Sequence, residues 1–239
     1  MKKILIPLLI IILVFLIYKF NEDDLIDYMV IGDSISCGIN SYGNKTYGYN
    51  DYLKNYLNSN NLLHKYNNYF SKDKYTIKEL LNDIKNNKNI IYNDKNYNLK
   101  KELRESDILT ISIGMDEIVN ILNKNKDFKN IKTDLDEIIN DMDNLIKIVT
   151  SYSKTNVILI GYYNPYNEYN KDIDKVFSYI NDKYNSIAKK YNIIYIDIYN
   201  IIKKDKTYLP NKIDYHLTSK GYLEIAKEVI EKNNLWCNK

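Results

Sequence analysis

Short apolar runs alternate along the chain with segments in which apolar residues recur every three or four positions. The apolar runs are 28–31, 66–70 (the weakest), 108–113, 157–160 and 193–198. Runs of this length, apolar at consecutive positions, indicate strands that are buried on both faces. The periodic segments are 49–57, 76–84, 131–152, 173–191 and 219–230, and their spacing predicts amphipathic helices.

This alternation of strands and helices predicts an α/β fold. We expect a three-layer α/β/α sandwich around a flavodoxin-like parallel sheet of about five strands. Such sheets bind ligands beyond the carboxyl ends of their strands, so the chemistry should lie in the loops that follow strands. The Asn- and Lys-rich stretches at 85–98 and 123–130 are expected to be surface loops or helix ends. A chain of 239 residues with 45% hydrophobic content can bury one core, and we expect a single domain at 27–239.

The N-terminus predicts a membrane segment. Lys2 and Lys3 precede an apolar run at 4–18, which Lys19 and Phe20 follow. The run is short for a spanning helix, but Lys19 can snorkel to the interface, so residues 1–20 are expected to be an anchor and 21–26 a linker. The charges on either side place the rest of the chain on the extracytoplasmic face of the cell membrane. A cleaved signal peptide and a secreted domain are the alternative, although no pair of small residues follows the run.

Charge and composition exclude several other classes of protein. The 34 basic and 31 acidic residues give a net charge of +3 that is spread along the chain, which argues against a nucleic-acid partner. The two cysteines, Cys37 and Cys237, do not make a disulfide framework, and Cys37 is expected to pack inward without a chemical role. With no glycine-rich phosphate loop, H-E-x-x-H motif or Cys/His cluster, we expect neither a metal nor a cofactor.

Three residues have the chemistry of an acyl-transfer site. Ser34 follows the first predicted strand, where a helix N-terminus would offer backbone N–H groups to an oxyanion. His216 stands two residues after Asp214 in the loop before the last predicted helix. A carboxylate at this distance can orient the imidazole, whose other nitrogen takes the serine proton. The other histidine, His64, has no acidic or nucleophilic neighbour in sequence, and we expect a structural or solvent-facing role for it.

Three motifs carry a resemblance to a known family. They are Gly32-Asp33-Ser34 after the first strand, Gly114-Met115-Asp116-Glu117 after a central strand, and Asp214-Tyr215-His216 with Gly221-Tyr222 before the last helix. Together they resemble the SGNH, or GDSL-like, hydrolases over about residues 27–230. The resemblance implies a serine esterase or lipase with Ser34 as nucleophile, His216 as general base and Asp214 as orienting acid. It also implies that Ser34, Gly114 and the position of Asp116 frame the oxyanion.

The chain departs from the family pattern at several points. Asp116 stands where the family has asparagine, and an ionised carboxylate would repel an oxyanion unless burial keeps it protonated. Losing one oxyanion donor typically costs about a hundred- to a thousandfold in rate. The segment 70–76 lacks the glycine of the family's second motif, and the late Asp-x-His is one residue shorter than the commoner Asp-x-x-His.

The sequence therefore predicts acyl-ester hydrolysis through an acyl-enzyme. Because the linker is short, lipid esters or acylated envelope glycans near the membrane are the expected substrates. Two alternatives stay open. One is a membrane-anchored binding protein with a degenerate catalytic site, and the other is an acyltransferase of the same fold.

Overall fold

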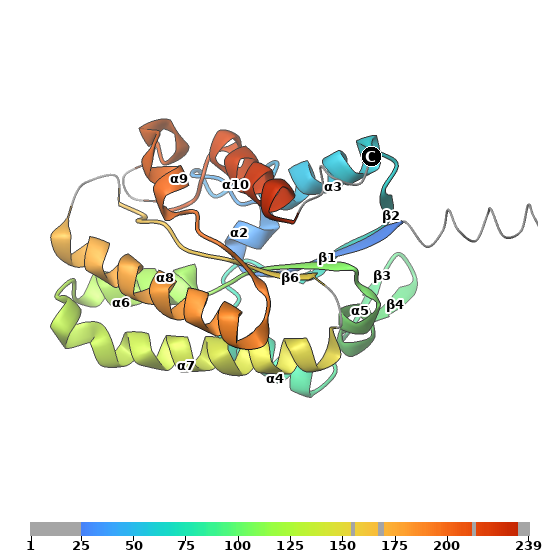
Figure 1. Cartoon of the computed structure of the whole chain (residues 1–239), viewed down its shortest axis with the longest axis horizontal. Coiled ribbons are helices and arrows are strands. Elements are labelled where there is room, and N and C mark those ends of the chain that lie inside the picture. The colour runs from blue at the N-terminus through green and yellow to red at the C-terminus, as the bar shows by residue number, and fades with distance from the viewer. Residues whose placement is uncertain (1–24, 154–155, 167–169, 212–213, 234–239) are drawn as a thin grey trace, which may run out of the picture.

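The centre of the molecule is a five-stranded sheet (Figure 1). The computed structural model describes residues 25–153, 156–166, 170–211 and 214–233. The strands are β1 (Ile26–Gly32), β2 (Leu63–Ser71), β5 (Ile108–Ser112), β6 (Asn156–Ile160) and β7 (Ile194–Ile196). They pair in parallel in the order β2-β1-β5-β6-β7. Counted along the chain this order is 2-1-3-4-5, which is that of flavodoxin-like folds.

The five predicted strands are confirmed, and their burial explains why they were visible. In β1 and β5, Val30, Ile31, Leu109 and Ile111 have no exposed surface. Both faces of these central strands are covered by helices, so consecutive positions are apolar. Strand β2 lies at the edge of the sheet and keeps polar residues along much of its length, which is why its pattern was the weakest.

Helices cover both faces of the sheet and make the expected three layers. One face carries α2 (Ser34–Cys37), α3 (Tyr49–Ser59), α9 (Tyr199–Lys203) and α10 (Ser219–Lys232) (Figure 1). The other carries α4 (Ile77–Lys85), α5 (Leu99–Glu105), α6 (Met115–Lys124), α7 (Phe128–Tyr152) and α8 (Lys171–Tyr191). The long predicted helices are confirmed to within a few residues. Their apolar positions, such as Met142 and Leu145 of α7, are buried.

One expectation was wrong. The segment 85–98 is not only loop and helix end, because it contains a hairpin of β3 (Asn89–Tyr92) and β4 (Lys95–Asn98). Its two turn residues, Asn93 and Asp94, have φ values of 46° and 59°. Positive φ at both central positions fits a two-residue hairpin turn, which Asn and Asp tolerate. The strands are short and mostly exposed, and their sequences, Asn-Ile-Ile-Tyr and Lys-Asn-Tyr-Asn, show no regular apolar alternation.

The predicted membrane anchor at 1–20 lies outside the described residues, as does most of the linker. Strand β1 begins at Ile26, one residue before the expected start of the domain. Among the helices that the structure describes, none combines the length and apolar character needed to cross a bilayer.

Candidate active site

Ser34 lies where β1 turns into the short helix α2. Gly32, the last residue of β1, has a φ of +147°, and a Cβ there would lie 1.9 Å from the carbonyl oxygen of Ser112 on β5. Only glycine permits this close approach of the two strands. Asp33 caps α2, and Ser34 is the first helical residue, so its N–H has no carbonyl partner within the helix. Ser34 therefore sits at the switch point between β1 and β5, where this fold binds its ligands.

Asp33 joins the loop after β1 to the loop after β5. Its buried carboxylate accepts hydrogen bonds from the backbone N–H groups of Ile35 (3.1 Å), Gly114 (2.9 Å) and Met115 (3.3 Å). Burial, followed by the charge of Asp116, raises the pKa of Asp33 to about 8, while these N–H donors oppose the shift. The N–H of Gly114, expected beside the oxyanion, is thus donated to Asp33.

Asp214 and His216 form a compact pair. Nδ1 of His216 lies 2.7 Å from Oδ1 of Asp214, and the same oxygen accepts the backbone N–H of His216 at 2.7 Å. The short Asp-x-His spacing therefore still brings the carboxylate to the imidazole. When Nδ1 carries the proton, Nε2 is left as an acceptor. Nε2 is buried and has no hydrogen-bond partner among the described residues.

Tyr215, between these two residues, links the whole site. Its hydroxyl donates to Oδ1 of Asp116 at 2.5 Å and lies 3.2 Å from Oγ of Ser34. Because the phenol proton is used on Asp116, the Ser34 hydroxyl is the donor in the second contact. The Tyr215 ring stacks on the His216 imidazole, with centroids 4.2 Å apart and planes at 29°. Burial, and next the bond to Asp116, raise the pKa of Tyr215 well above its usual value.

Asp116 points into this site from the first turn of α6. Its Oδ2 is buried and has no hydrogen-bond partner within the described part of the chain. The next residue, Glu117, turns away and accepts the N–H of Ile77 at the start of α4, with both oxygens at 3.3 Å. Burial raises the pKa of Glu117 to about 7. Two carboxyl groups, those of Asp33 and Asp116, thus flank the predicted nucleophile.

The two remaining candidate residues, His64 and Cys37, either lie away from this site or are unreactive. His64 is exposed and pairs with Asp27 at 2.6 Å, near the amino end of β1 and away from Ser34. Burial, and then Asp33, raise the pKa of the Cys37 thiol to about 12, so little reactive thiolate forms at neutral pH. In the ranges that the structure covers, no three His, Cys, Asp or Glu residues are grouped as metal ligands.

The structure brings most of the predicted residues together through a residue that was not predicted. Ser34 and Asp116 both contact Tyr215, and Asp214 holds His216. No direct hydrogen bond joins Ser34 to His216 in the described structure, since Tyr215 takes the serine hydroxyl. Asp33 and Tyr215 lie inside the recognised motifs, but no pattern of residues indicated their contacts.

Comparison with known proteins identifies the family. A family model described as GDSL-like Lipase/Acylhydrolase matches residues 28–229. The lipase Lip_vut3 from a goat rumen metagenome is 19% identical, with a TM-score of 0.70 over 87% of this chain and 97% of that one. The acetylxylan esterase Axe2 from Geobacillus stearothermophilus is 18% identical, with a TM-score of 0.61 over 87% and 93%. LAE5, an alpha/beta hydrolase enzyme from the metagenome of Lake Arreo, Spain, is 16% identical, with a TM-score of 0.63 over 87% and 95%.

No curated protein matches the chain significantly. The family match nevertheless runs from β1 to α10 and includes every residue of the site described above. The chain therefore belongs to the GDSL-like lipase/acylhydrolase family and is a hydrolase of ester bonds.

Proposed function

We propose that this enzyme hydrolyses acyl esters through an acyl-enzyme on Ser34, with His216 as general base and Asp214 as its orienting acid. The observation that carries the proposal is the 2.7 Å contact between Asp214 and His216, which leaves Nε2 available in the same side-chain cluster as Ser34. Catalytic mutants of the structural neighbour Axe2 replace a serine, an aspartate and a histidine, the same three residue types.

The chemistry follows from the two ends of the imidazole. Oγ of Ser34 attacks the ester carbonyl carbon while Nε2 of His216 takes its proton, and Asp214 stabilises the resulting imidazolium at Nδ1. The tetrahedral intermediate then breaks its bond to the alkoxide, which leaves with the proton from Nε2. Water adds to the acyl-enzyme by the same route, giving the free acid and restoring Ser34.

Tyr215 and Asp116 together take the place of the family's asparagine in this proposal. In the free enzyme Tyr215 covers Ser34, which has no exposed surface, so an entering ester displaces the phenol from Oγ. The phenol proton stays on Asp116, so the Ser34 N–H is the donor nearest to the developing oxyanion, which the loop at 114–116 frames. Asp116 alone would repel that charge, and its hydrogen bond to Tyr215 offsets the repulsion.

The membrane anchor at 1–20, with the catalytic domain outside the cytoplasm, is also a proposal. It is supported by the apolar sequence of that segment and the charges around it. Strand β1 begins at Ile26 beside the linker and ends at Gly32 next to Ser34. Seven residues of strand span roughly 20 Å, so the site lies at the end of the sheet opposite to Ile26, where β1 begins.

Turnover of p-nitrophenyl acetate by the full chain in mild detergent tests the proposed function. Ser34→Ala and His216→Ala should each lower kcat at least a hundredfold. His64→Ala is the matched control, because His64 also pairs with an aspartate, at 2.6 Å, but far from the site. Equal activity in all variants would contradict the roles of Ser34 and His216, and an inert wild type would favour the binding-protein alternative. Acyl transfer to added glycerol in preference to water would instead identify an acyltransferase.

A further inference from the structure

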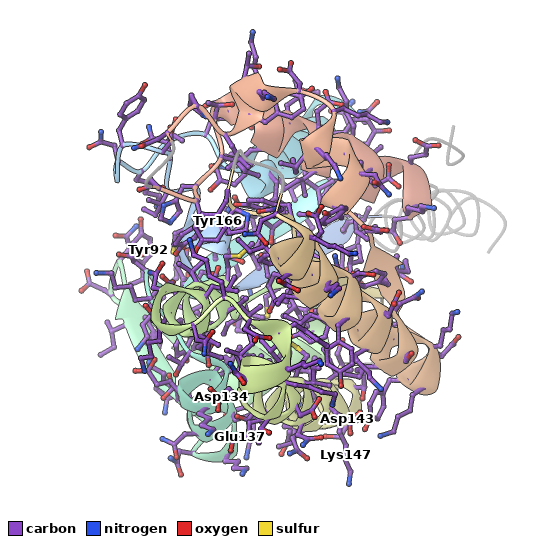
Figure 2. All side chains as sticks on the ribbon, turned by 90° about the vertical axis from the view of Figure 1, so that its left-hand side faces the viewer. Tyr92, Asp134, Glu137, Asp143, Lys147 and Tyr166 are labelled. Atoms are coloured by element: carbon purple, nitrogen blue, oxygen red, sulfur yellow. The ribbon has the colours of Figure 1, made fainter. Side chains whose placement is uncertain are left out.

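A pocket lies beside the loop that carries Asp214 and His216, at the carboxyl edge of β6 and β7. It has a volume of about 240 Å³ and is formed by the loop after β6, the first turn of α8, helix α9 and the 3₁₀ turn η1 (Lys206–Tyr208). Figure 2 looks onto this edge of the molecule, where Tyr166 is labelled. The floor is apolar and buried, made by Tyr163, Ile202 and Leu209. Its volume is below the 300–1,000 Å³ of pockets for drug-sized ligands, roughly that of one small ring.

Tyr163 connects this pocket to the loop that carries Asp214 and His216. Tyr163 lines the pocket, and its hydroxyl donates to the backbone oxygen of Tyr215 at 2.7 Å. The side chain of Tyr215 meanwhile reaches Ser34 on the other side. A group in the pocket would therefore belong to a part of the substrate that lies next to the reacting ester, across the loop from it.

The wall of the pocket is fixed by hydrogen bonds. Oδ1 of Asp174 accepts from the side-chain amide of Asn164 at 3.0 Å and from the hydroxyl of Tyr199 at 2.5 Å. Oδ1 of Asn164 accepts the backbone N–H of Tyr166 at 2.9 Å. An ammonium group lies over each of the two tyrosine rings. Nζ of Lys126 is 4.9 Å from the ring centre of Tyr166, and Nζ of Lys203 is 5.4 Å from that of Tyr199.

The lining groups select the chemistry of the ligand. The pocket offers aromatic surface together with both donors, Lys203 and Lys206, and acceptors, Asp174 and Asp205. An acyl chain would strip water from these charges and return no hydrogen bonds, which is costly. A phosphate would gain little, because the two carboxylates offset the attraction of the two ammonium groups. A neutral sugar fits, because its hydroxyls donate and accept while its C–H faces pack on tyrosine.

We propose that this pocket binds a neutral sugar unit of a polysaccharide whose neighbouring unit carries the ester that Ser34 attacks. The inference rests on the proposed function and specifies its substrate class. It agrees with the position of the site, which lies at the end of the sheet opposite to the start of β1 and so faces away from a membrane that holds the N-terminus.

The test compares two activities of the full chain in the same detergent. The first is release of acetate from acetylated xylo-oligosaccharides of one to six units, and the second is hydrolysis of p-nitrophenyl acetate. Tyr166→Ala should lower the ratio of their kcat/KM values about tenfold for the longer oligosaccharides, the effect of losing one aromatic contact. Lys206→Gln, at the exposed rim, should lower the ratio in the same direction. Tyr92→Ala is the matched control, since Tyr92 is also a partly exposed tyrosine but belongs to the hairpin at the other end of the sheet.

Binding without catalysis separates this inference from the proposed function. Unacetylated xylo-, cello- and chito-oligosaccharides are titrated into wild type and Tyr166→Ala by calorimetry. At least one of them should bind the wild type about tenfold more tightly than it binds Tyr166→Ala. If sugar binding depends on Tyr166 but the protein has no esterase activity, the sugar pocket is supported and the proposed hydrolase function is contradicted. Esterase activity with an unchanged ratio and no sugar binding would overturn the pocket. If Tyr166→Ala changes only the preference for octanoate over acetate esters, the pocket binds an acyl chain, and the sugar proposal is also overturned.

Discussion

The contact between Tyr215 and Asp116 should decide how well the enzyme tolerates a carboxylate where its family has an amide. The phenol O–H is the one hydrogen-bond donor that the described structure gives to Asp116, at 2.5 Å, and the second carboxylate oxygen is buried without a partner. Tyr215→Phe keeps the ring that stacks on His216 and removes only this hydroxyl. Without the hydrogen bond from Tyr215, the negative charge of Asp116 would repel the oxyanion more strongly.

The expected size of the effect follows from that single bond. Hydrogen bonds to charged groups contribute about 1.5–3 kcal/mol. If the bond offsets the charge in the transition state, Tyr215→Phe should lower kcat/KM for p-nitrophenyl acetate by about tenfold to 150-fold. Asp116→Asn removes the charge, still accepts the phenol and adds an N–H donor, so activity should be kept or raised. In the Asp116→Asn background, Tyr215→Phe should then cost no more than about threefold, because a neutral amide needs no screen.

The double-mutant cycle is therefore the assay, with melting temperatures measured on all four proteins. Tyr179→Phe is the control, since it removes a hydroxyl that also donates to an aspartate, Asp136, at 2.5 Å, but between α7 and α8. Independent sites add within about 0.5 kcal/mol. If Tyr215→Phe costs the same factor with Asp116 and with Asn in that position, the two residues do not act as a unit and the reasoning is refuted.

Three further predictions concern stability and reactivity. Gly114→Ala should lower the Tm by roughly 5 °C. Gly114 has a φ of +106°, and a new Cβ there would lie 2.4 Å from the Tyr162 hydroxyl. In the control Gly43→Ala the new Cβ meets nothing within 4 Å, so an equal loss of Tm in the two variants would contradict this prediction. Burial raises the pKa of Glu117 from 4.5 to about 7, so its neutral form stabilises the fold below pH 4.5 and this contribution is lost as the pH rises through 7. Glu117→Gln should therefore gain up to about 3 kcal/mol over wild type between those pH values, and parallel stability curves would argue against it. Since burial raises the pKa of Cys37 to about 12, iodoacetamide at pH 8 should alkylate it on the order of a thousandfold more slowly than a free thiol, and rapid labelling by peptide mapping would show otherwise.

The sheet was predictable because its central strands are buried on both faces, which leaves uninterrupted apolar runs such as those around Ile31 and Ile111. The β3–β4 hairpin was not, because its strands are short, mostly exposed and without regular apolar alternation, and only the turn at Asn93 and Asp94 marks it. Edge elements of this kind are stabilised by backbone pairing and a few ring contacts, such as that of Tyr92 with Tyr69. Neither leaves a periodic pattern in the sequence.

In the site, the motifs gave the positions of the reactive residues but not their contacts. Asp116 looked like a defect in sequence, because its partner lies 99 positions away in the loop of His216. Tyr215 occupies the unspecified position of Asp-x-His, so no pattern assigns it a role. Likewise the N–H of Gly114 seemed free until Asp33 was seen to accept it. Such contacts depend on how the loops after β1 and β5 and the loop before α10 meet in space.

The most direct test of the account is covalent labelling of the nucleophile. The full chain is treated with a fluorophosphonate, and the modified residue is located by mass spectrometry of its peptides, in wild type, Ser34→Ala and His216→Ala. The account predicts one adduct per chain on Ser34, absent from Ser34→Ala and formed at least a hundredfold more slowly in His216→Ala. Labelling at another residue, or a rate that does not depend on His216, would contradict it.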